Sequence, residues 1–479
     1  MSPHVATGVY IILIAGLFWL NRDREARTSS ALWVPTVWLL INASRPVSQW
    51  LAVVGLNAGS GPMTQADMYL EGSPLDRNAF MALLAAGLLV VLSRRRQAGA
   101  LLGSNAPILL FFSYCLLSIL WSDYNFITFK HWTKGVGDIV MVSVVLTDSE
   151  PDAALKRILA RAAFLLIPLS VLFIKYYPQL GREYNPWVWT PMYSGVTLGK
   201  NMLGMTCMVC GLGSLWSFLA AYQNQKGGER SRRLIAHGAV LSMVFWLIWM
   251  SNSMTSLACF GLAGGLLVIM SLFRSARKPP LVHFLVAAVI FVPLLALFSD
   301  VGGGMVQSLG RDATLTGRTG IWKVILTLAG NSLVGTGYES FWLPERLVKI
   351  GTLTMKGLQE AHNGYLEVYL NLGWIGVALL ALLIVTGYRN VLLALRRDPS
   401  QGAIRLAFLV AALVFSFTEA GFRMMTPVWI TFLLATIVAP EAVVPETPPS
   451  LGIKRAHNVA EGEPQLNNVF DIGFPGETS

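Results

Sequence analysis

LVHFLVAAVIFVPLLALF at residues 281–298 and NGYLEVYLNLGWIGVALLALLIVT at residues 363–386 are apolar runs long enough to cross a lipid bilayer. The segment between them, residues 299–362, begins SDVGGGMVQSLGRDATLTGRTGIW and ends GLQEAH. Its many charged side chains cannot lie in a lipid core. Polar side chains gathered in one loop of a membrane protein indicate a functional site. We therefore expect the remaining helices to hold this loop over the bilayer.

Apolar runs recur along almost the whole chain of 479 residues. The chain is 54% hydrophobic and only 13% charged, whereas soluble proteins have roughly 25% charged residues. The pattern predicts an all-α, polytopic membrane bundle of about twelve to thirteen transmembrane helices. The first run lacks a basic segment before it, which favours a retained helix over a cleaved signal peptide. The predicted helices lie near 5–20, 31–43, 77–92, 107–121, 136–147, 158–174, 199–221, 234–250, 254–273, 281–298, 363–386, 404–419 and 424–439.

Basic residues mark every second loop, and this explains the net charge of +10 without nucleic-acid binding. By the positive-inside rule the basic loops face the cytoplasm. The loop 299–362 then faces outside, with the loops 44–76, 122–135, 175–198 and 251–253. The basic positions are Arg22, Arg24, Arg27, Arg94, Arg95, Arg96, Lys156, Arg157, Lys226, Arg230, Arg232, Arg233, Arg274, Arg277, Lys278, Arg389, Arg396 and Arg397.

Two regions divide the chain. Residues 1–439 form the transmembrane domain, and residues 440–479, rich in Pro, Glu and Gly, are expected to be a disordered cytoplasmic tail. Cys207 and Cys210 form a C-x-x-C, but they lie in an apolar helical run, where packing is the better interpretation than redox chemistry or zinc. The six histidines are scattered, so the sequence predicts no metal site.

The stretch from Gly317 predicts an amphipathic helix, with Ile321 and Ile325 on the face that would lie on the membrane surface. Arg318 falls in its first turn, where the helix dipole disfavours a cation. A role facing phosphate would explain this position, and so would an interfacial arginine that snorkels into water. GTGYE at residues 335–339 reads as a tight turn, since it lacks the context of a nucleotide-binding loop.

His362 stands at the start of a membrane helix, between Glu360 and Asn363. On a helix it would share one face with Tyr365 and Tyr369. Proton transfer and a plain surface position are both consistent with this setting.

The aromatic loop 175–198 fits either a membrane-interface belt or sugar stacking. Lys200 and Asn201 follow it at the mouth of the next helix. Lys200 could snorkel or bind a phosphate there.

Several of these motifs together resemble the O-antigen ligase superfamily, and within it the exopolysaccharide polymerases of the ExoQ type. The resemblance covers about residues 1–439. It is carried by LGRDATLTGRTGIW at 309–322, GTGYESFW at 335–342, AHNGYLEVYLNLGWIG at 361–376, EGSPLDR at 71–77 and TLGKNMLG at 197–204.

This resemblance implies a GT-C-like glycosyltransferase of the bacterial inner (cytoplasmic) membrane. The donor would be an oligosaccharide on undecaprenyl diphosphate, handled at the periplasmic face without a metal or other cofactor. His362 and Arg318 match the family's catalytic histidine and arginine. The implied substrate-binding residues are Arg311, Lys200, Asn201, Asn363, Tyr365 and Glu360.

One position departs from the family pattern. The family carries a basic residue in an S-R-T or S-K-T turn, and here that turn reads Ser253-Met254-Thr255. The missing charge would have to come from elsewhere. The candidates are Lys200, Arg311 and Arg182.

The chemistry agrees with the implied reaction. A departing diphosphate gains negative charge, which arginine stabilises with paired hydrogen bonds. A histidine is suited to take the proton of the attacking sugar hydroxyl. Attack opposite the leaving group would invert the anomeric centre.

We therefore expect a polymerase of lipid-linked repeats that makes exopolysaccharide. A ligase that moves glycan onto a lipid core or a protein is the alternative. A secondary transporter is the second alternative, although no inverted repeat is visible. The expected partners are the lipid-linked oligosaccharide, the lipid bilayer, and the chain-length and export proteins of the pathway, with no nucleic acid.

Overall fold

The computed structural model describes residues 1–438 apart from 24–26, 57–72, 185–188, 299–317 and 355–359. The chain divides into the units Met1–Pro440 and Glu441–Ser479. The predicted tail lies outside the described residues. The unit Met1–Pro440 is helical, and the strands in its described part are β1 (Arg182–Tyr184) and β2 (Pro191–Tyr193), which pair antiparallel. The predicted all-α class is confirmed.

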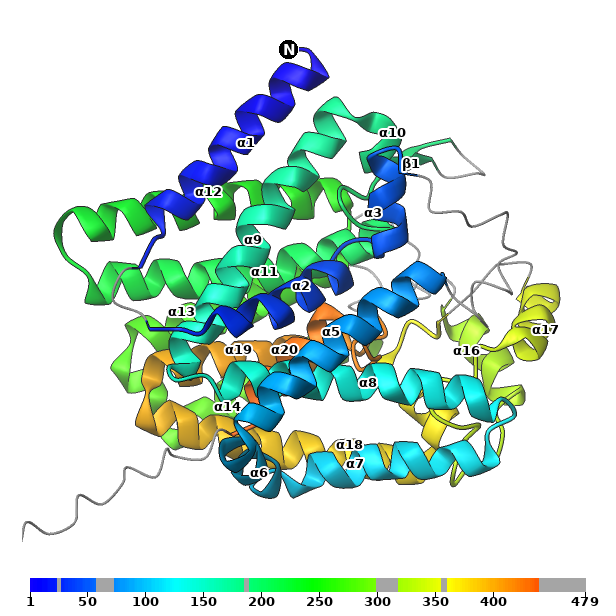
Figure 1. Ribbon diagram of the computed structural model, residues 1–479. Helices are drawn as coiled ribbons and strands as arrows, with labels where there is room; N and C mark the ends of the chain where they lie inside the picture. Colours follow the sequence, from blue (N-terminus) through cyan, green and yellow to red (C-terminus); the bar gives the residue numbers. More distant parts are fainter. Residues whose placement is uncertain (24–26, 57–72, 185–188, 299–317, 355–359, 439–479) are drawn as a thin grey trace, which may run out of the picture. The chain divides into compact units, whose positions relative to one another are not determined.

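Each of the thirteen predicted apolar runs corresponds to a helix (Figure 1). These helices are α1 (Pro3–Leu20), α2 (Trp33–Asn42), α5 (Pro74–Ser93), α7 (Ala106–Leu117), α8 (Asn125–Leu146), α9 (Pro151–Tyr176), α11 (Lys200–Asn224), α12 (Gly227–Ser251), α13 (Met254–Leu272), α14 (Pro279–Phe298), α18 (Gly364–Arg397), α19 (Pro399–Phe415) and α20 (Pro427–Thr436). Shorter elements lie between them: η1 (Ser30–Leu32), α3 (Val47–Val53), α6 (Arg95–Gly103), η2 (Ser118–Trp121), α10 (Pro178–Gly181), η3 (Arg274–Arg277), α16 (Arg318–Thr327) and α17 (Pro344–Thr354).

Seven of the described helices are long and apolar enough to cross a membrane, or eight if the pair Arg95–Gly103 and Ala106–Trp121, bent by 87°, forms one span. Four shorter apolar segments, Ser30–Asn42, Pro279–Leu295, Pro399–Phe415 and Pro427–Thr436, account for most of the difference from the expected twelve to thirteen. A short helix surrounded by protein is tolerated at membrane depth because neighbouring elements meet its polar backbone.

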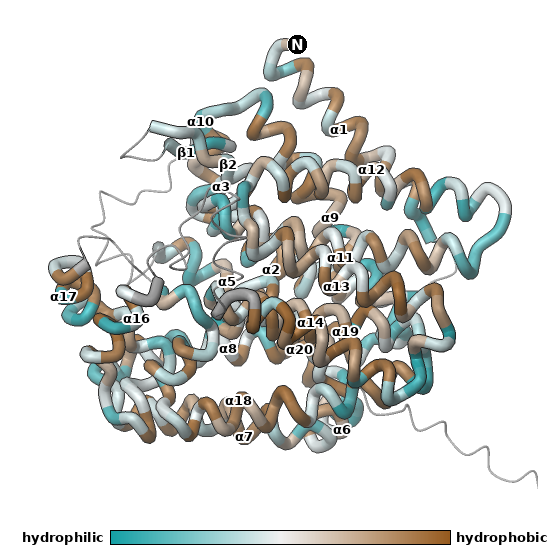
Figure 2. Tube along the Cα trace, turned by 180° about the vertical axis from the view of Figure 1, so that it is seen from behind, coloured by the Kyte–Doolittle hydropathy of each residue, from teal (hydrophilic) through white to brown (hydrophobic). Residues whose placement is uncertain are grey.

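The helices α19 and α20 form the centre of the bundle. Every residue of α20, and all of α19 from Gln401 to its end, is buried. They contact each other, and around them pack α11, α13, α18 and α8 (Figure 1). Figure 2 shows hydrophobic residues along the middle of the helices and hydrophilic residues toward their ends, as expected of a bundle whose helices cross an apolar layer.

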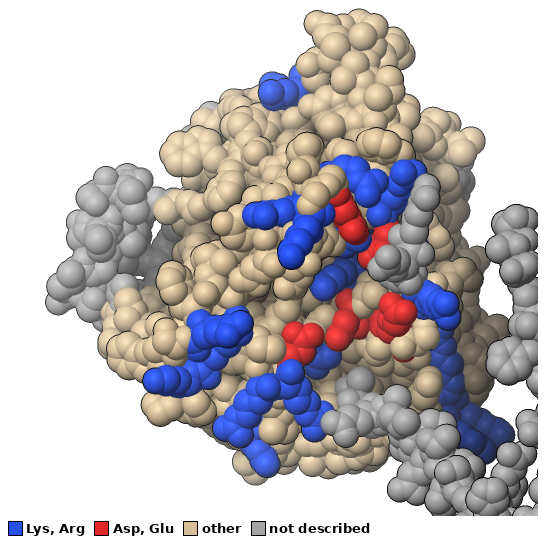
Figure 3. Space-filling model, turned by 90° about the vertical axis from the view of Figure 1, so that its left-hand side faces the viewer, with Lys and Arg blue, Asp and Glu red and all other residues tan. Residues whose placement is uncertain are grey.

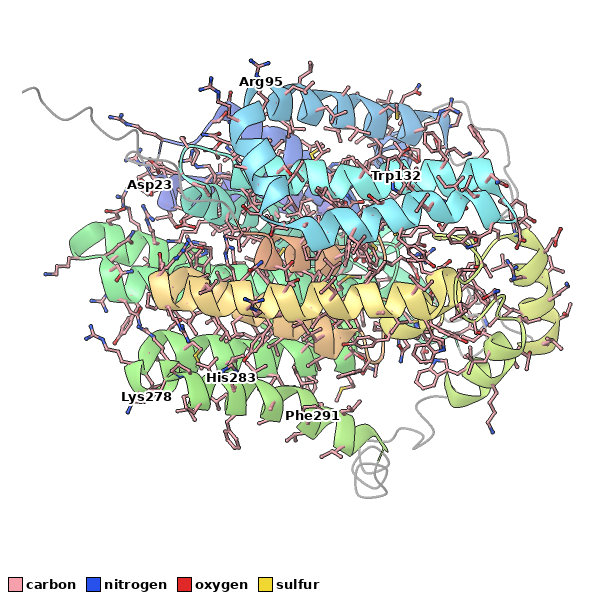
Figure 4. All side chains as sticks on the ribbon, turned by 90° about the horizontal axis from the view of Figure 1, so that it is seen from below. Asp23, Arg95, Trp132, Lys278, His283 and Phe291 are labelled. Atoms are coloured by element: carbon pink, nitrogen blue, oxygen red, sulfur yellow. The ribbon has the colours of Figure 1, made fainter. Side chains whose placement is uncertain are left out.

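The loops assemble into the two sets that the charge pattern predicted. At the basic end, Arg94 pairs with Asp148 at 3.3 Å and Arg233 pairs with Asp23 at 2.9 Å. Figure 4 places Asp23, Arg95 and Lys278 at this end. At the site end, Arg346 of the large loop pairs with Asp123 at 2.5 Å. Which end faces the cytoplasm stays a prediction.

Three expectations about the loops need correction. Residues 125–135 are not loop, because α8 begins at Asn125. The basic residues expected in a loop after residue 386 lie within α18, which continues to Arg397. The apolar face of α16 does not lie on a membrane surface. Ile321 and Ile325 are buried against Phe341 and Ile350, in a small core within the loop.

The tight turn expected at residues 335–339 is confirmed, and it seats the large loop on α18. Gly335 has φ +70° and lies so close to the backbone of Asn371 that a Cβ would approach within 2.4 Å. Gly373 has φ +64° and lies equally close to the backbone of Leu333. Because only glycine tolerates both the left-handed conformation and this contact, the two positions fix the loop against the start of α18.

Candidate functional site

The peptide that precedes His362 is fixed on both sides. The backbone N–H of Ala361 donates to Glu367 Oε1 at 2.5 Å, and its carbonyl accepts from Trp322 Nε1 at 2.8 Å. Trp342 Nε1 donates to the other oxygen of Glu367 at 2.8 Å. Glu367 is buried at the start of α18, and Trp322 belongs to α16. These bonds therefore hold α16 and the end of the large loop together at His362.

His362 lies before α18 and not within it. Its φ of +49° is left-handed, and the N-cap of α18 is Asn363, whose Oδ1 accepts from the N–H groups of Tyr365 and Leu366. The expected helical face shared by His362, Tyr365 and Tyr369 is therefore wrong. A non-glycine residue at positive φ persists only where its surroundings enforce it.

Two carboxylates hold the imidazole of His362. Nδ1 lies 2.9 Å from Glu360 Oε1 and 3.1 Å from Glu419 Oε2. Glu419 comes from the connection between α19 and α20, and its side chain is buried. Burial by itself would lower the pKa of His362, but the hydrogen bonds and negative charges of Glu360 and Glu419 outweigh it and raise the pKa to about 9. The imidazole is thus protonated at neutral pH.

Glu419 also connects this cluster to the start of α11. Asn201 Nδ2 donates to Glu419 Oε1 at 3.4 Å, and Lys200 is the first residue of α11. Thr418, which precedes Glu419, shares a 2.9 Å hydrogen bond with Thr255. The turn that carries Met254 therefore lies beside the same cluster.

A second ion pair lies on the same connection. Arg423 Nε lies 3.1 Å from Glu339 Oε2, and the carbonyl of Glu339 accepts from the imidazole of His131 at 3.1 Å. Because that carbonyl can only accept, Nδ1 of His131 carries a proton. Arg423 and Glu339 thereby join the tight turn of the large loop to the α19–α20 connection.

The structure brings some of the predicted residues together. His362, Glu360 and Asn201 meet at Glu419, with Lys200 adjacent in the chain to Asn201. Arg311 lies outside the described residues. Arg318 is the first residue of α16, one turn before Trp322.

Asn363 and Tyr365 have structural partners. Asn363 caps α18 and donates to the carbonyl of Phe417 at 3.2 Å, while Tyr365 donates to the carbonyl of Leu413 at 3.1 Å and stacks on Phe417. Arg182, a candidate for the missing charge, donates to the carbonyl of Ile174 at 2.9 Å, beside the aromatic loop.

Neither Glu419 nor Arg423 belongs to the motifs that the sequence indicated. One signal pointed to Glu419: it is an acidic residue between two strongly apolar runs, 404–419 and 424–439. A charge in that setting marks a functional position. Its partner could not be read from the sequence, because His362 lies 57 residues away.

The side chains of Glu360, His362 and Glu419 could also hold a divalent ion. One ligand atom each from Glu360, His362 and Glu419 lie within 4.8 Å of one another. The donor set of one imidazole and two carboxylates suits such an ion. A protonated imidazole cannot coordinate, however, so an ion and the proton of His362 would compete for this position.

The geometry suits transfer chemistry on an anionic substrate. A protonated imidazole lies between two carboxylates, and Asn201 at the start of α11 bonds to one of them. Such an arrangement can bind a diphosphate, stabilise its departure, and accept a proton from a hydroxyl group.

The comparisons with known proteins agree with this chemistry. The O-antigen ligase family model (Wzy_C) matches residues 237–381, which include Arg318, Glu360 and His362. The exopolysaccharide production protein ExoQ of Rhizobium meliloti (strain 1021) is 26% identical over 360 residues, covering 72% of this chain and 79% of ExoQ. The chain is therefore a multi-pass membrane protein that is similar to the O-antigen ligase family over residues 237–381 and to ExoQ over most of its length.

Proposed function

We propose that this protein is a glycosyltransferase that joins oligosaccharide repeats linked to undecaprenyl diphosphate into exopolysaccharide, at the periplasmic face of the bacterial inner membrane. The observation that carries the proposal is His362, held between Glu360 and Glu419 at the end of the large loop. The similarity to ExoQ supports the product class, and the O-antigen ligase family match supports transfer from a lipid-linked glycan.

The leaving group of this reaction is undecaprenyl diphosphate. Its negative charge grows as the bond from the anomeric carbon to the phosphate oxygen breaks. We assign Arg318 and protonated His362 to this charge, because paired donors placed where charge develops lower the barrier most. The raised pKa of His362 supports a cation at this position.

The acceptor hydroxyl must lose its proton as its oxygen attacks the anomeric carbon. A residue that is protonated at neutral pH cannot take that proton. We therefore assign the role of base to Glu360. Its side chain is about one-third exposed and can be reached by an acceptor, whereas the side chain of Glu419 is buried. This assignment revises our expectation that His362 is the base.

Lys200 replaces, in our proposal, the basic residue that the turn at Met254 lacks. It opens α11, and the next residue, Asn201, bonds to Glu419. Gly204, one turn further along α11, lies against Ser253, so the first turn of α11 packs directly on the turn that carries Met254. Arg182 lies in the hairpin of β1 and β2, bonded to the carbonyl of Ile174.

A purified protein incubated with synthetic lipid-linked repeat units tests the function. We expect a ladder of longer lipid-linked products, seen by gel or mass spectrometry. His362→Ala should bind the donor without elongating it. His362→Gln retains hydrogen bonding but lacks the charge. It should therefore separate a role in holding the substrate from a role in stabilising the leaving diphosphate. If the wild-type protein does not lengthen the lipid-linked repeat units, the proposal is overturned. Equal activity with and without a chelator would support a reaction that needs no metal.

A ligase is the second candidate, favoured by the description of the matching family. The two reactions share the donor and differ only in the acceptor. Supplying a lipid core and lipid-linked repeats together decides between them. Transfer to the core alone, without repeat-to-repeat products, would establish the ligase.

A further inference from the structure

A cavity of about 1160 Å³ lies at the basic end of the bundle. It is lined by the beginning of α9, the end of α11, the beginning of α12 and the residues after α1. The candidate site lies at the other end of α11, which has 25 residues and thus spans about 37 Å. This cavity is therefore separate from the site that we assign to transfer.

Basic side chains dominate the lining. Six are Lys or Arg, against four Asp or Glu. Figure 3 shows the end of the molecule to which these helices lead, with Lys and Arg gathered around a smaller group of Asp and Glu. Two of the four acids, Asp23 and Glu229, pair with the same arginine, Arg233, at 2.9 and 2.6 Å. Acidic side chains therefore do not balance the basic lining.

Three cations crowd one end of α9. Lys156 and Arg157 are adjacent, and Arg161 lies one turn beyond Arg157, where like charges repel. All three lie in the half of the helix nearer its N-terminus, beside the cavity.

Aromatic rings hold two of these cations in place. The guanidinium of Arg161 lies 4.0 Å from the ring centroid of Trp33, and the ammonium of Lys156 lies 4.9 Å from that of Trp216. Among the described residues no carboxylate forms an ion pair with either side chain. Both are half-buried. Half-buried cations that form no ion pair offer a preorganised site for an anion.

We propose that this cavity binds the phosphate of a lipid headgroup, with Lys156 and Arg161 as its principal ligands. Phe18 of α1 and Trp33 of α2 line the cavity. The outward residues of α1 include Ile12 and Trp19, which are 73% and 55% exposed and offer an apolar surface for acyl chains. Basic pockets between membrane helices on the cytoplasmic side, where the charge pattern predicts this end to lie, bind anionic headgroups by the same contacts.

The double variant Lys156→Gln/Arg161→Gln tests the site. Its control is Arg95→Gln/Arg96→Gln, which removes two exposed positive charges at the same end without touching the cavity. Each protein is purified into detergent and titrated with phosphatidylglycerol, and the bound lipids are counted by native mass spectrometry. Size-exclusion profiles and circular dichroism confirm that each variant is folded. We expect roughly thirtyfold weaker phosphatidylglycerol binding in the cavity variant, and a change within about threefold in the control.

Titrations with other ligands identify which kind of anion the cavity binds. Phosphatidylcholine should bind markedly more weakly than phosphatidylglycerol, because its phosphate is paired with its own cation. Equal losses in the two double variants would reveal only general surface attraction and would overturn the proposal. Inorganic phosphate or glycerol phosphate that bound the wild-type protein as tightly as the lipid would assign the cavity to a soluble anion and overturn the lipid assignment. Every readout is binding, so the result does not depend on transfer activity.

Discussion

Glu419 Oε2 lies 3.1 Å from Nδ1 of His362, although 57 residues separate them in the chain. The contact joins the connection between α19 and α20 to the end of the large loop. Glu419 at the same time accepts from Asn201 at the start of α11. One buried carboxylate therefore joins the α19–α20 connection, the end of the large loop and the start of α11, which are distant from one another in the sequence.

Replacing that carboxylate should weaken the site without unfolding the bundle. Glu419→Gln keeps the shape of the side chain but removes its charge, so the pKa of His362 should fall toward its ordinary value. A hydrogen bond to a charged group contributes about 1.5–3 kcal/mol, so we expect polymer formation to slow by roughly 10- to 150-fold. Product quantification and an NMR titration of His362 measure the two effects. An unchanged pKa would mean that Glu419 does not act through His362.

The pH dependence of transfer distinguishes a His362 that acts as a cation from a His362 that acts as a general base. Its pKa is raised to about 9, so the imidazole is charged below that pH and loses its proton above it. If the cation stabilises the leaving diphosphate, the rate falls as pH rises through about 9, whereas a base would make it rise. Stability follows the same sign. The contribution of this ion pair is complete below the unfolded pKa of about 6.5 and disappears as pH rises through about 9. His362→Gln should lack both transitions.

Arg318→Ala should abolish polymer without lowering the amount of protein in the membrane. Loss of one donor to a developing charge typically costs about 10²–10³ in rate. Arg318→Lys should recover only part of the activity, because an ammonium lacks the planar fork of arginine. The neighbouring Lys323→Ala, on an exposed part of α16, is the matched control. Full activity in Arg318→Ala would remove Arg318 from the site.

A charge exchange tests the role of Lys200. Lys200→Met should reduce transfer, and adding Met254→Arg should restore it in part, since the turn at Met254 lies against the first turn of α11. Met254→Arg alone should leave the rate close to that of the wild-type protein. A double variant no more active than Lys200→Met would show that the two positions do not serve the same phosphate. Donor binding, measured beside turnover, separates lost affinity from lost rate.

Sidedness is testable with a single added cysteine. The four native cysteines are buried, so they give little background. Ser308→Cys in the large loop should react with an impermeant thiol reagent in intact spheroplasts. Ser275→Cys, exposed at the basic end, should react only after permeabilisation. The opposite pattern would reverse the topology and contradict a periplasmic site.

The sequence by itself determined the class of protein, the positions of its helices and the grouping of its loops. Apolar length and the alternation of basic loops are local properties, and the bilayer converts them directly into helices and sides. The sequence motifs also indicated His362 and Arg318, because both lie in the longest polar segment between membrane helices.

Only the tertiary structure decided what surrounds His362. Periodicity assigned it to a helical face, but the cap at Asn363 and the bonds on both sides of Ala361 place it before the helix, with φ +49°. Its partner Glu419 and the cavity around Lys156 and Arg161 arise where segments distant in the chain meet. The charge of a side chain is written in the sequence, but the pKa depends on which buried carboxylates the packing brings within hydrogen-bond distance.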